Sequence, residues 1–255
     1  MGAVSNDEQN NNELKRNVLE ERLAFVYRCV LIIICAWCLL LNLFTQDGKF
    51  DTGMLIFFTI ISNILCFIFI IIIVINSIIT SSNKELNKIE GKTKVLTRVR
   101  GAVTLMITVT FLIYHFVLIP QATAVGSAFD FFGLPNVLAH YVVPIMMILD
   151  WLLFEKKNSY RPYDPLLWLI FPIVYFVIIL IRGYFGGIIK MIGSKYPYFF
   201  IDVDALGMNQ VWINAGFASL FFLLIGYLIF FVDRFRIADG NLYFGKRQLT
   251  ALGNK

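Results

Sequence analysis

Long apolar runs separated by short polar segments make up most of the chain. A helix that spans a bilayer needs about 20 mostly apolar residues. Six such windows occur, at residues 24–44, 54–79, 97–119, 134–154, 164–182 and 211–232. They predict an all-α polytopic membrane protein with six transmembrane helices in one bundle. We expect residues 1–23 to be a polar, partly disordered tail, residues 24–232 the membrane domain, and residues 233–255 a C-terminal tail.

The composition agrees with this pattern, because 58% of the residues are hydrophobic and only 15% are charged. A soluble domain could not bury so much apolar surface. The first window is too long for the apolar part of a signal peptide, and acidic residues precede it, so we interpret it as a retained helix.

Lysine and arginine gather in alternate polar segments. They are Lys15, Arg16 and Arg22 in the N-terminal tail; Lys84, Lys88, Lys92, Lys94 and Arg98 in the second connection; Lys156, Lys157 and Arg161 in the fourth; and Arg234, Arg236, Lys246, Arg247 and Lys255 in the C-terminal tail. Cytoplasmic loops are enriched in these residues, so both termini are predicted to be cytoplasmic. The formal net charge of +5 therefore requires no nucleic-acid partner.

Cysteine and histidine give no pattern of a metal or redox site. Cys35 and Cys38 have the C-x-x-C spacing, but they lie within an apolar window, where free cysteines are typical buried residues. The chain has two histidines, and neither belongs to a zinc-binding pattern. We therefore expect no metal and no cofactor.

Three polar side chains from three windows are predicted to lie at one depth in the membrane. With a helical rise of about 1.5 Å per residue, Thr59, His115 and His140 each lie about 8–9 Å below the outer margin. Asp150 lies about 15 Å further toward the cytoplasm. An ionisable group at such a depth is costly and usually faces a polar interior.

Helical periodicity places further polar residues on the same faces. The three faces contain Thr59, Ser62, Asn63 and Cys66; Thr104, Thr108 and His115; and Asn136, His140, Pro144, Met147 and Trp151. We expect these faces to enclose a polar pocket in the outer half of the bundle.

A threonine and a histidine at matching depth are candidates for nucleophilic catalysis. A histidine is the usual base at neutral pH and can take the proton of a threonine hydroxyl. Ser62, Asn63 or His115 could then donate a hydrogen bond to the oxyanion of a tetrahedral intermediate. Structural alternatives remain open: Thr59 could bond its own helix, His115 could contact headgroups, and Asp150 could pair with Lys156 or Arg161.

Several motifs resemble those of a known family. "FFTIISN", "LPNVLAHYVVPIMMILDW", "LIRG" and "YPYFFIDVD" are similar to segments of the androgen-induced gene 1 and FAR-17a family, in particular its bacterial six-helix branch, over roughly residues 20–235. Animal members of this family are membrane hydrolases that cleave the ester between a fatty acid and a hydroxy fatty acid. The resemblance implies that Thr59 is the nucleophile and His140 its catalytic partner.

Residues 183–210 form a long connection that could lie in the membrane interface or re-enter as a lid. Arg182, just before it, could bind the carboxylate of a fatty acid or anchor the helix at the interface.

The sequence thus predicts an intramembrane threonine hydrolase of lipid esters that forms an acyl-threonine intermediate in a bacterial plasma membrane. Thr59 and His140 would be catalytic, and Ser62, Asn63, His115, Asn136 and Arg182 would support them or bind substrate. One alternative is a proton-coupled carrier that uses Asp150, His140 and Arg182. Another is an acyltransferase with the same residues. A lipid ester and the bilayer are the expected partners, and the sequence leaves the oligomeric state open.

Overall fold

The structure, a computed structural model, describes the backbone of residues 2–45, 47–82, 90–126, 129–155, 157–238 and 241–244. Side chains are described for residues 19–45, 47–80, 96–126, 129–155 and 157–235. Six helices within these ranges are long and apolar enough to cross a membrane: Leu19–Leu43, Phe58–Thr80, Leu96–Ala124, Leu134–Phe154, Asp164–Phe185 and Met208–Arg234. The predicted all-α, multi-pass membrane fold is confirmed.

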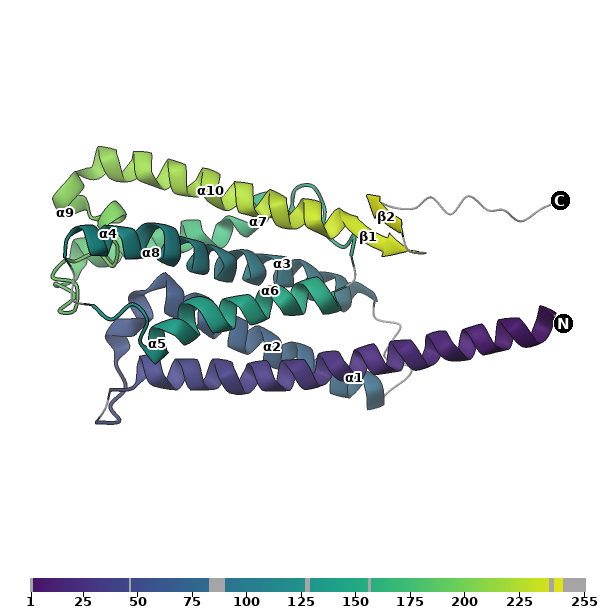
Figure 1. Ribbon diagram of the computed structural model, residues 1–255. Helices are drawn as coiled ribbons and strands as arrows, with labels where there is room; N and C mark the ends of the chain where they lie inside the picture. Colours follow the sequence, from purple (N-terminus) through teal and green to yellow (C-terminus); the bar gives the residue numbers. More distant parts are fainter. Residues whose placement is uncertain are drawn as a thin grey trace. The chain divides into compact units, whose positions relative to one another are not determined.

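The elements follow one another as a series of long helices with short 3₁₀ and π segments between them (Figure 1). They are α1 (Gly2–Leu43), η1 (Thr52–Ile56), α2 (Phe58–Ser82), α3 (Glu90–Ile113), η3 (Tyr114–Leu118), α4 (Ile119–Ala124), α5 (Leu134–Val137), η4 (Leu138–Val142), α6 (Val143–Phe154), α7 (Asp164–Trp168), α8 (Ile170–Phe185), η5 (Phe199–Ile201), α9 (Val203–Leu206), α10 (Met208–Arg234), β1 (Phe235–Ala238) and β2 (Asn241–Phe244).

The structure differs from the sequence prediction at both ends of the chain. α1 begins at Gly2 and therefore includes the polar residues for which we expected partial disorder; glutamate, glutamine and lysine in this stretch are good helix formers. The strands β1 and β2 pair as a short antiparallel hairpin directly after α10, within the predicted C-terminal tail.

The chain divides into two compact units. The first contains Met1–Ile89 and Thr110–Glu155, and the second contains Glu90–Val109 and Lys156–Lys255. Each unit is described separately.

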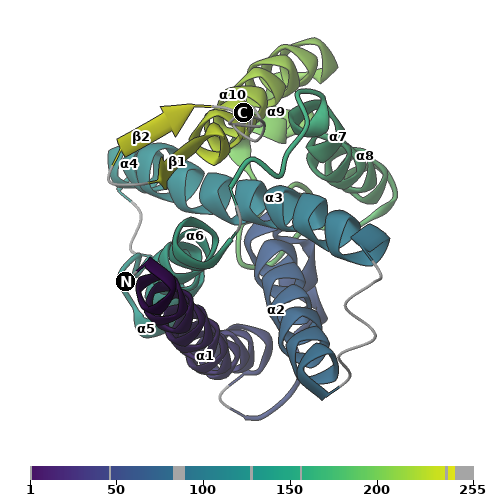
Figure 2. The same ribbon diagram turned by 90° about the vertical axis from the view of Figure 1, so that its right-hand side faces the viewer.

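In the first unit, α1 lies beside both α2 and α6 (Figures 1 and 2). Apolar side chains fill the contact between α1 and α2, where Leu39, Leu43 and Ile60 are buried and Met54 and Phe57 pack against them. This core holds the beginning of α2, because Ile60 lies in its first turn.

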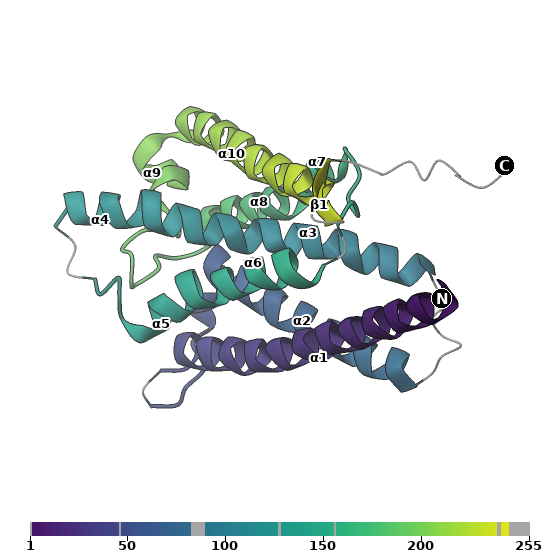
Figure 3. The same ribbon diagram turned by 45° about the vertical axis from the view of Figure 1, so that its right-hand side comes forward.

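The third and fourth spans each contain a π-helical segment. Figure 3 shows α3 continuing into α4, and α5 continuing into α6, as extended rods. The segments η3 and η4 lie at these two junctions, and a proline follows each one, Pro120 in α4 and Pro144 in α6. Proline lacks an N–H group and its ring clashes with the carbonyl four residues earlier in a regular α-helix, so a wider turn accommodates it.

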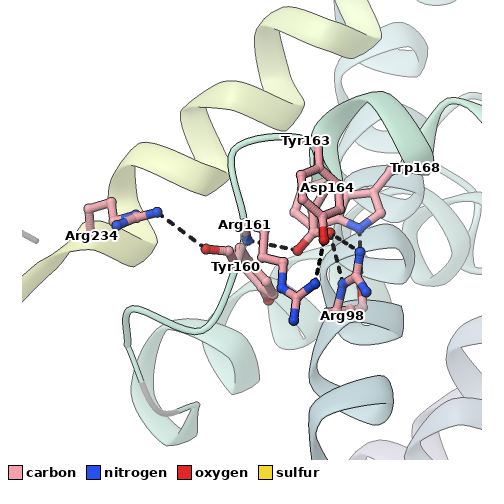
Figure 4. A network of polar contacts seen from close by, with 7 residues as sticks. All are labelled: Arg98, Tyr160, Arg161, Tyr163, Asp164, Trp168 and Arg234. Atoms are coloured by element: carbon pink, nitrogen blue, oxygen red, sulfur yellow. Dashed lines mark hydrogen bonds and ion pairs between the residues drawn. The ribbon is translucent and has the colours of Figure 1, made fainter. Parts of the chain in front are cut away.

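A polar network stabilises the second unit (Figure 4). Arg98 Nε on α3 donates to Asp164 Oδ1 at 2.8 Å, and Trp168 Nε1 donates to the Arg98 carbonyl at 3.1 Å. A side chain at Gly101 could not be accommodated, because its Cβ would lie 2.2 Å from Trp168 Cζ2. Arg234 Nη2, at the end of α10, donates to the Tyr160 carbonyl at 3.4 Å. These bonds connect α3 with α7, and α10 with the segment that precedes α7.

The predicted orientation can be tested with exposed positions near the two ends of the first span, Leu19–Leu43. Asp47→Cys, in the first connection, should react with a membrane-impermeant thiol reagent added to intact cells, and Glu21→Cys should not, because the N-terminal side is predicted to be cytoplasmic. Both native side chains are exposed. The parent protein is the control, since its four cysteines lie within the spans. Labelling of Glu21→Cys alone would reverse the orientation.

Candidate active site

Thr59 lies in the first turn of α2. Asp51 Oδ1 accepts a hydrogen bond from the Gly53 N–H at 2.9 Å, and the extended backbone of Phe57 (φ −83°, ψ 131°) ends η1. α2 therefore begins at Phe58, whereas the sequence predicted a span from residue 54. The cause is turn chemistry: an aspartate that bonds the N–H two residues later starts a turn, although the following residues are apolar. Thr59 is half-buried.

His140 lies in the middle of the π-helical segment η4. The Val143 N–H donates to the Leu138 carbonyl, five residues earlier, in place of the usual four. In a regular helix the ring of Pro144 would clash with the His140 carbonyl. The side chain of His140 is buried, and the residue is 8% exposed.

The structure brings Thr59 and His140 together within the first unit. Thr59 Oγ1 lies 3.1 Å from His140 Nε2, and His140 Nδ1 lies 3.0 Å from the Asn136 carbonyl oxygen. A carbonyl can only accept, so Nδ1 carries the proton, and Nε2 of the neutral ring is an acceptor. The Thr59 hydroxyl therefore donates to Nε2. This is the tautomer and direction that general-base catalysis requires.

Asn136 contributes its main chain and not its side chain to this site. Its carbonyl fixes the imidazole in the way that the aspartate does in a Ser-His-Asp triad. Its side-chain Nδ2 donates to the Asp130 carbonyl at 2.7 Å. The sequence identified the residue, but it could not identify the atom, because only the backbone geometry brings this carbonyl to the imidazole.

Asn63 connects three segments around Thr59. Its Nδ2 donates to the Thr59 carbonyl at 2.8 Å and to the Ala139 carbonyl at 3.0 Å, and its Oδ1 accepts a weak bond from Cys38 Sγ at 3.7 Å. Asn63 is fully buried. Because both amide protons are engaged, Asn63 holds α2 against η4 and α1 and does not donate to a substrate in this structure.

Ser62 is also engaged with its neighbours. Its hydroxyl donates to the Thr59 carbonyl at 2.9 Å, so its oxygen accepts from Thr110 Oγ1, also at 2.9 Å. Ser62 is fully buried. Its role in this structure is to hold the backbone of Thr59, whereas the sequence had suggested an oxyanion donor.

The aromatic residue beside His140 is Tyr114 and not His115. The rings of Tyr114 and His140 are stacked, with centroids 3.5 Å apart and planes inclined by 10°. His115 is exposed, and its Nδ1 lies 2.9 Å from the hydroxyl of Tyr141. The predicted face of Thr104, Thr108 and His115 is therefore wrong at its last residue. Tyr114 does lie four residues after Thr110, the partner of Ser62, and that helical spacing could have identified it.

Asp150 forms an ion pair with Arg28, a residue that the sequence pattern did not indicate. Arg28 Nε on α1 lies 2.7 Å from Asp150 Oδ1, and both side chains are buried. Tyr27, beside Arg28, donates its hydroxyl to the Met146 carbonyl at 2.9 Å. The sequence had suggested Lys156 or Arg161 as the partner of Asp150. Lys156 lies outside the described residues and Arg161 belongs to the second unit, whereas α1 supplies a cation within the membrane span itself.

Arg182 belongs to the second unit. It lies in the last turn of α8, and its Nη1 donates to the Lys195 carbonyl at 2.5 Å. The connection that follows contains an isolated bridge between Ile189 and Ser194, and Gly183 packs directly against Tyr196. Arg182 thus anchors this loop, which has no helix between residues 186 and 198.

Metal-binding groups do not gather in the part of the chain that the structure describes. No group of three or more histidine, cysteine, aspartate or glutamate residues there could hold a metal ion. The four cysteines are free thiols. The site around Thr59 and His140 contains a hydroxyl, an imidazole and the backbone carbonyl of Asn136.

Comparisons of the sequence with known protein families, with curated proteins and with solved structures give no match. The case for a function depends on the residues and on their geometry in the first unit.

Proposed function

We propose that this protein is an intramembrane threonine hydrolase that cleaves fatty-acyl esters. The observation that carries the proposal is the hydrogen bond from Thr59 Oγ1 to His140 Nε2 at 3.1 Å, with Nδ1 held by the Asn136 carbonyl at 3.0 Å. Threonine is a weak nucleophile until a base takes its proton. A neutral imidazole in this tautomer is such a base.

In the proposed reaction, Thr59 Oγ attacks the ester carbonyl carbon while its proton moves to His140 Nε2. The tetrahedral intermediate collapses to an acyl-threonine, and the imidazolium gives the proton to the departing alcohol oxygen. Water then attacks the acyl-threonine with His140 again acting as base, and the fatty acid leaves. Thr59 lies in the first turn of α2, where the partial positive charge of the helix end favours the negative charge that develops on the reacting oxygens.

The membrane setting and the sequence motifs support an acyl ester as the substrate. Six apolar spans indicate a protein within the bilayer, where esters with long acyl chains concentrate. The similarity of "FFTIISN" and "LPNVLAHYVVPIMMILDW" to the androgen-induced gene 1 and FAR-17a family points to esters of hydroxy fatty acids. With the predicted orientation, the site would face the outer half of a bacterial plasma membrane.

The site geometry fits an acyltransferase as well as a hydrolase, but it is less favourable for a proton-coupled carrier. An acyltransferase would use the same acyl-threonine and differ only in whether an alcohol or water accepts the acyl group. A proton-coupled carrier that uses Asp150 is less favoured, because Asp150 is held by Arg28 at 2.7 Å and lies about 15 Å along the helix from His140.

The proposal is tested on the purified protein in lipid nanodiscs. A panel of acyl esters, including an ester of a fatty acid with a hydroxy fatty acid, should yield free acid, and added alcohols should show whether the acyl group is transferred. A fluorophosphonate should label Thr59, which mass spectrometry would locate on the peptide containing "FFTIISN". Labelling at another residue together with active hydrolysis would assign the nucleophile elsewhere, and absence of all hydrolysis and transfer would refute the proposal.

A further inference from the structure

Tyr114 covers one face of the His140 imidazole. The two ring centroids lie 3.5 Å apart and the planes are nearly parallel, inclined by 10°. Both residues are buried, with exposures of 4% for Tyr114 and 8% for His140. The contact joins the two π-helical segments, because Tyr114 is the first residue of η3 and His140 the middle residue of η4.

Tyr114 is itself held in place. Its hydroxyl donates to the Phe131 carbonyl at 2.6 Å, and its ring makes an edge contact with Tyr141 at a centroid distance of 5.9 Å. The phenol is therefore bound at its tip and supported at its edge. A ring held in this way cannot swing away when the imidazole moves.

Stacking on Tyr114 restricts an out-of-plane tilt of the His140 imidazole that its two hydrogen bonds allow. Asn136 and Thr59 occupy the two nitrogens of His140, and the N–H bond and the lone pair of these nitrogens lie in the ring plane. A tilt of the imidazole out of that plane would turn Nε2 away from Thr59, and hydrogen bonds weaken steeply as their angle decreases. The ring of Tyr114 is in contact with one face of the imidazole and opposes a tilt of the imidazole toward that side.

The stacking contact between Tyr114 and His140 also stabilises the imidazolium form of His140. When the proton of Thr59 moves to Nε2, the imidazole becomes a cation that lies over the face of Tyr114. The face of an aromatic ring attracts a cation, and the attraction is larger where water is excluded. Tyr114 therefore interacts more favourably with the ring after proton transfer than before it, which is the condition for lowering a reaction barrier.

We propose that Tyr114 is a positioning residue for the Thr59–His140 pair, which fixes the plane of the imidazole and stabilises the imidazolium formed during acylation and deacylation. This inference rests on the proposed function. Tyr114 contacts His140 and acts through it. Its hydroxyl donates a hydrogen bond to the Phe131 carbonyl, so Tyr114 takes no part in the bonds that form or break.

The test compares Tyr114→Leu, which removes the aromatic face, with Tyr114→Phe, which keeps it. The Tyr114 ring both packs against His140 and stabilises the imidazolium. Its removal in Tyr114→Leu should therefore lower kcat roughly tenfold to 100-fold with little change in KM. Tyr114→Phe should restore most of kcat, because it loses only the bond to Phe131. Phe111→Leu is the matched control, since Phe111 contacts His115 and Tyr141 in the same aromatic group and should leave kcat near the parent value.

Two isosteric variants keep the inference falsifiable if Tyr114→Leu does not fold. Pentafluorophenylalanine at position 114 has the shape of phenylalanine but an electron-poor face, so its kcat should be clearly lower than that of Tyr114→Phe at equal melting temperature. Equal kcat for these two variants, or a folded Tyr114→Leu with the parent's kcat, overturns the inference. The proposed function fails separately, because its failure would appear as an inactive parent or an active Thr59→Ala variant.

Discussion

The Thr59→Ala variant is expected to lose ester hydrolysis and fluorophosphonate labelling together. Without the hydroxyl no acyl-enzyme can form, and His140 has no proton to take from the chain. His140→Ala should retain the nucleophile but slow both reactions about 10²- to 10⁴-fold, the usual contribution of a general base. Turnover and labelling rates of purified variants in nanodiscs provide the measurement.

The matched controls separate chemistry from folding. Thr59→Ser keeps a hydroxyl beside His140 and should retain part of the activity. Thr108→Ala removes a threonine hydroxyl that donates to its own helix, at Thr104 O, and should hydrolyse esters like the parent. Each variant must elute as a single species with the parent's melting temperature. A well-folded Thr59→Ala that still hydrolyses the same esters would exclude Thr59 as the nucleophile.

The spans could be predicted because they depend on a regular property of the chain. Helical depth grouped Thr59 with His115 and His140, and the family resemblance implied that His140 is the partner. Apolar length defines the spans, and the rise of an α-helix places two residues of neighbouring spans at similar depth. Thr59 and His140 form a hydrogen bond although α2 begins at Phe58, which places Thr59 nearer the helix end than expected.

The residues that the sequence missed are those whose position depends on irregular backbone or on a distant partner. A depth estimate with uniform helical geometry selected His115, whereas the residue that packs on His140 is Tyr114, at the start of a π-helical turn. Arg28 was overlooked because it lies inside an apolar window, and only the packing of α1 against α6 reveals Asp150 as its partner.

The ion pair between Arg28 and Asp150 leads to the second large expected effect, on stability. Breaking a buried ion pair by removing one member typically costs about 3–5 kcal/mol. Arg28→Ala should therefore unfold much more readily than the parent, and it also loses the contact of the guanidinium with the ring of Phe154, 5.8 Å away. Unfolding of the purified protein in mild detergent, followed by intrinsic fluorescence, measures the difference.

The double variant Arg28→Met with Asp150→Leu tests whether the loss comes from the broken ion pair. Well-packed apolar replacements of a buried pair are often neutral or stabilising, so the double variant should recover most of the stability lost in Arg28→Ala. It should also retain ester hydrolysis, because the pair lies about 15 Å along the helix from His140. A proton-coupled carrier would behave differently, since removal of Asp150 would abolish its coupling. A parent without esterase activity whose transport is lost in the stable double variant would favour the carrier over the hydrolase.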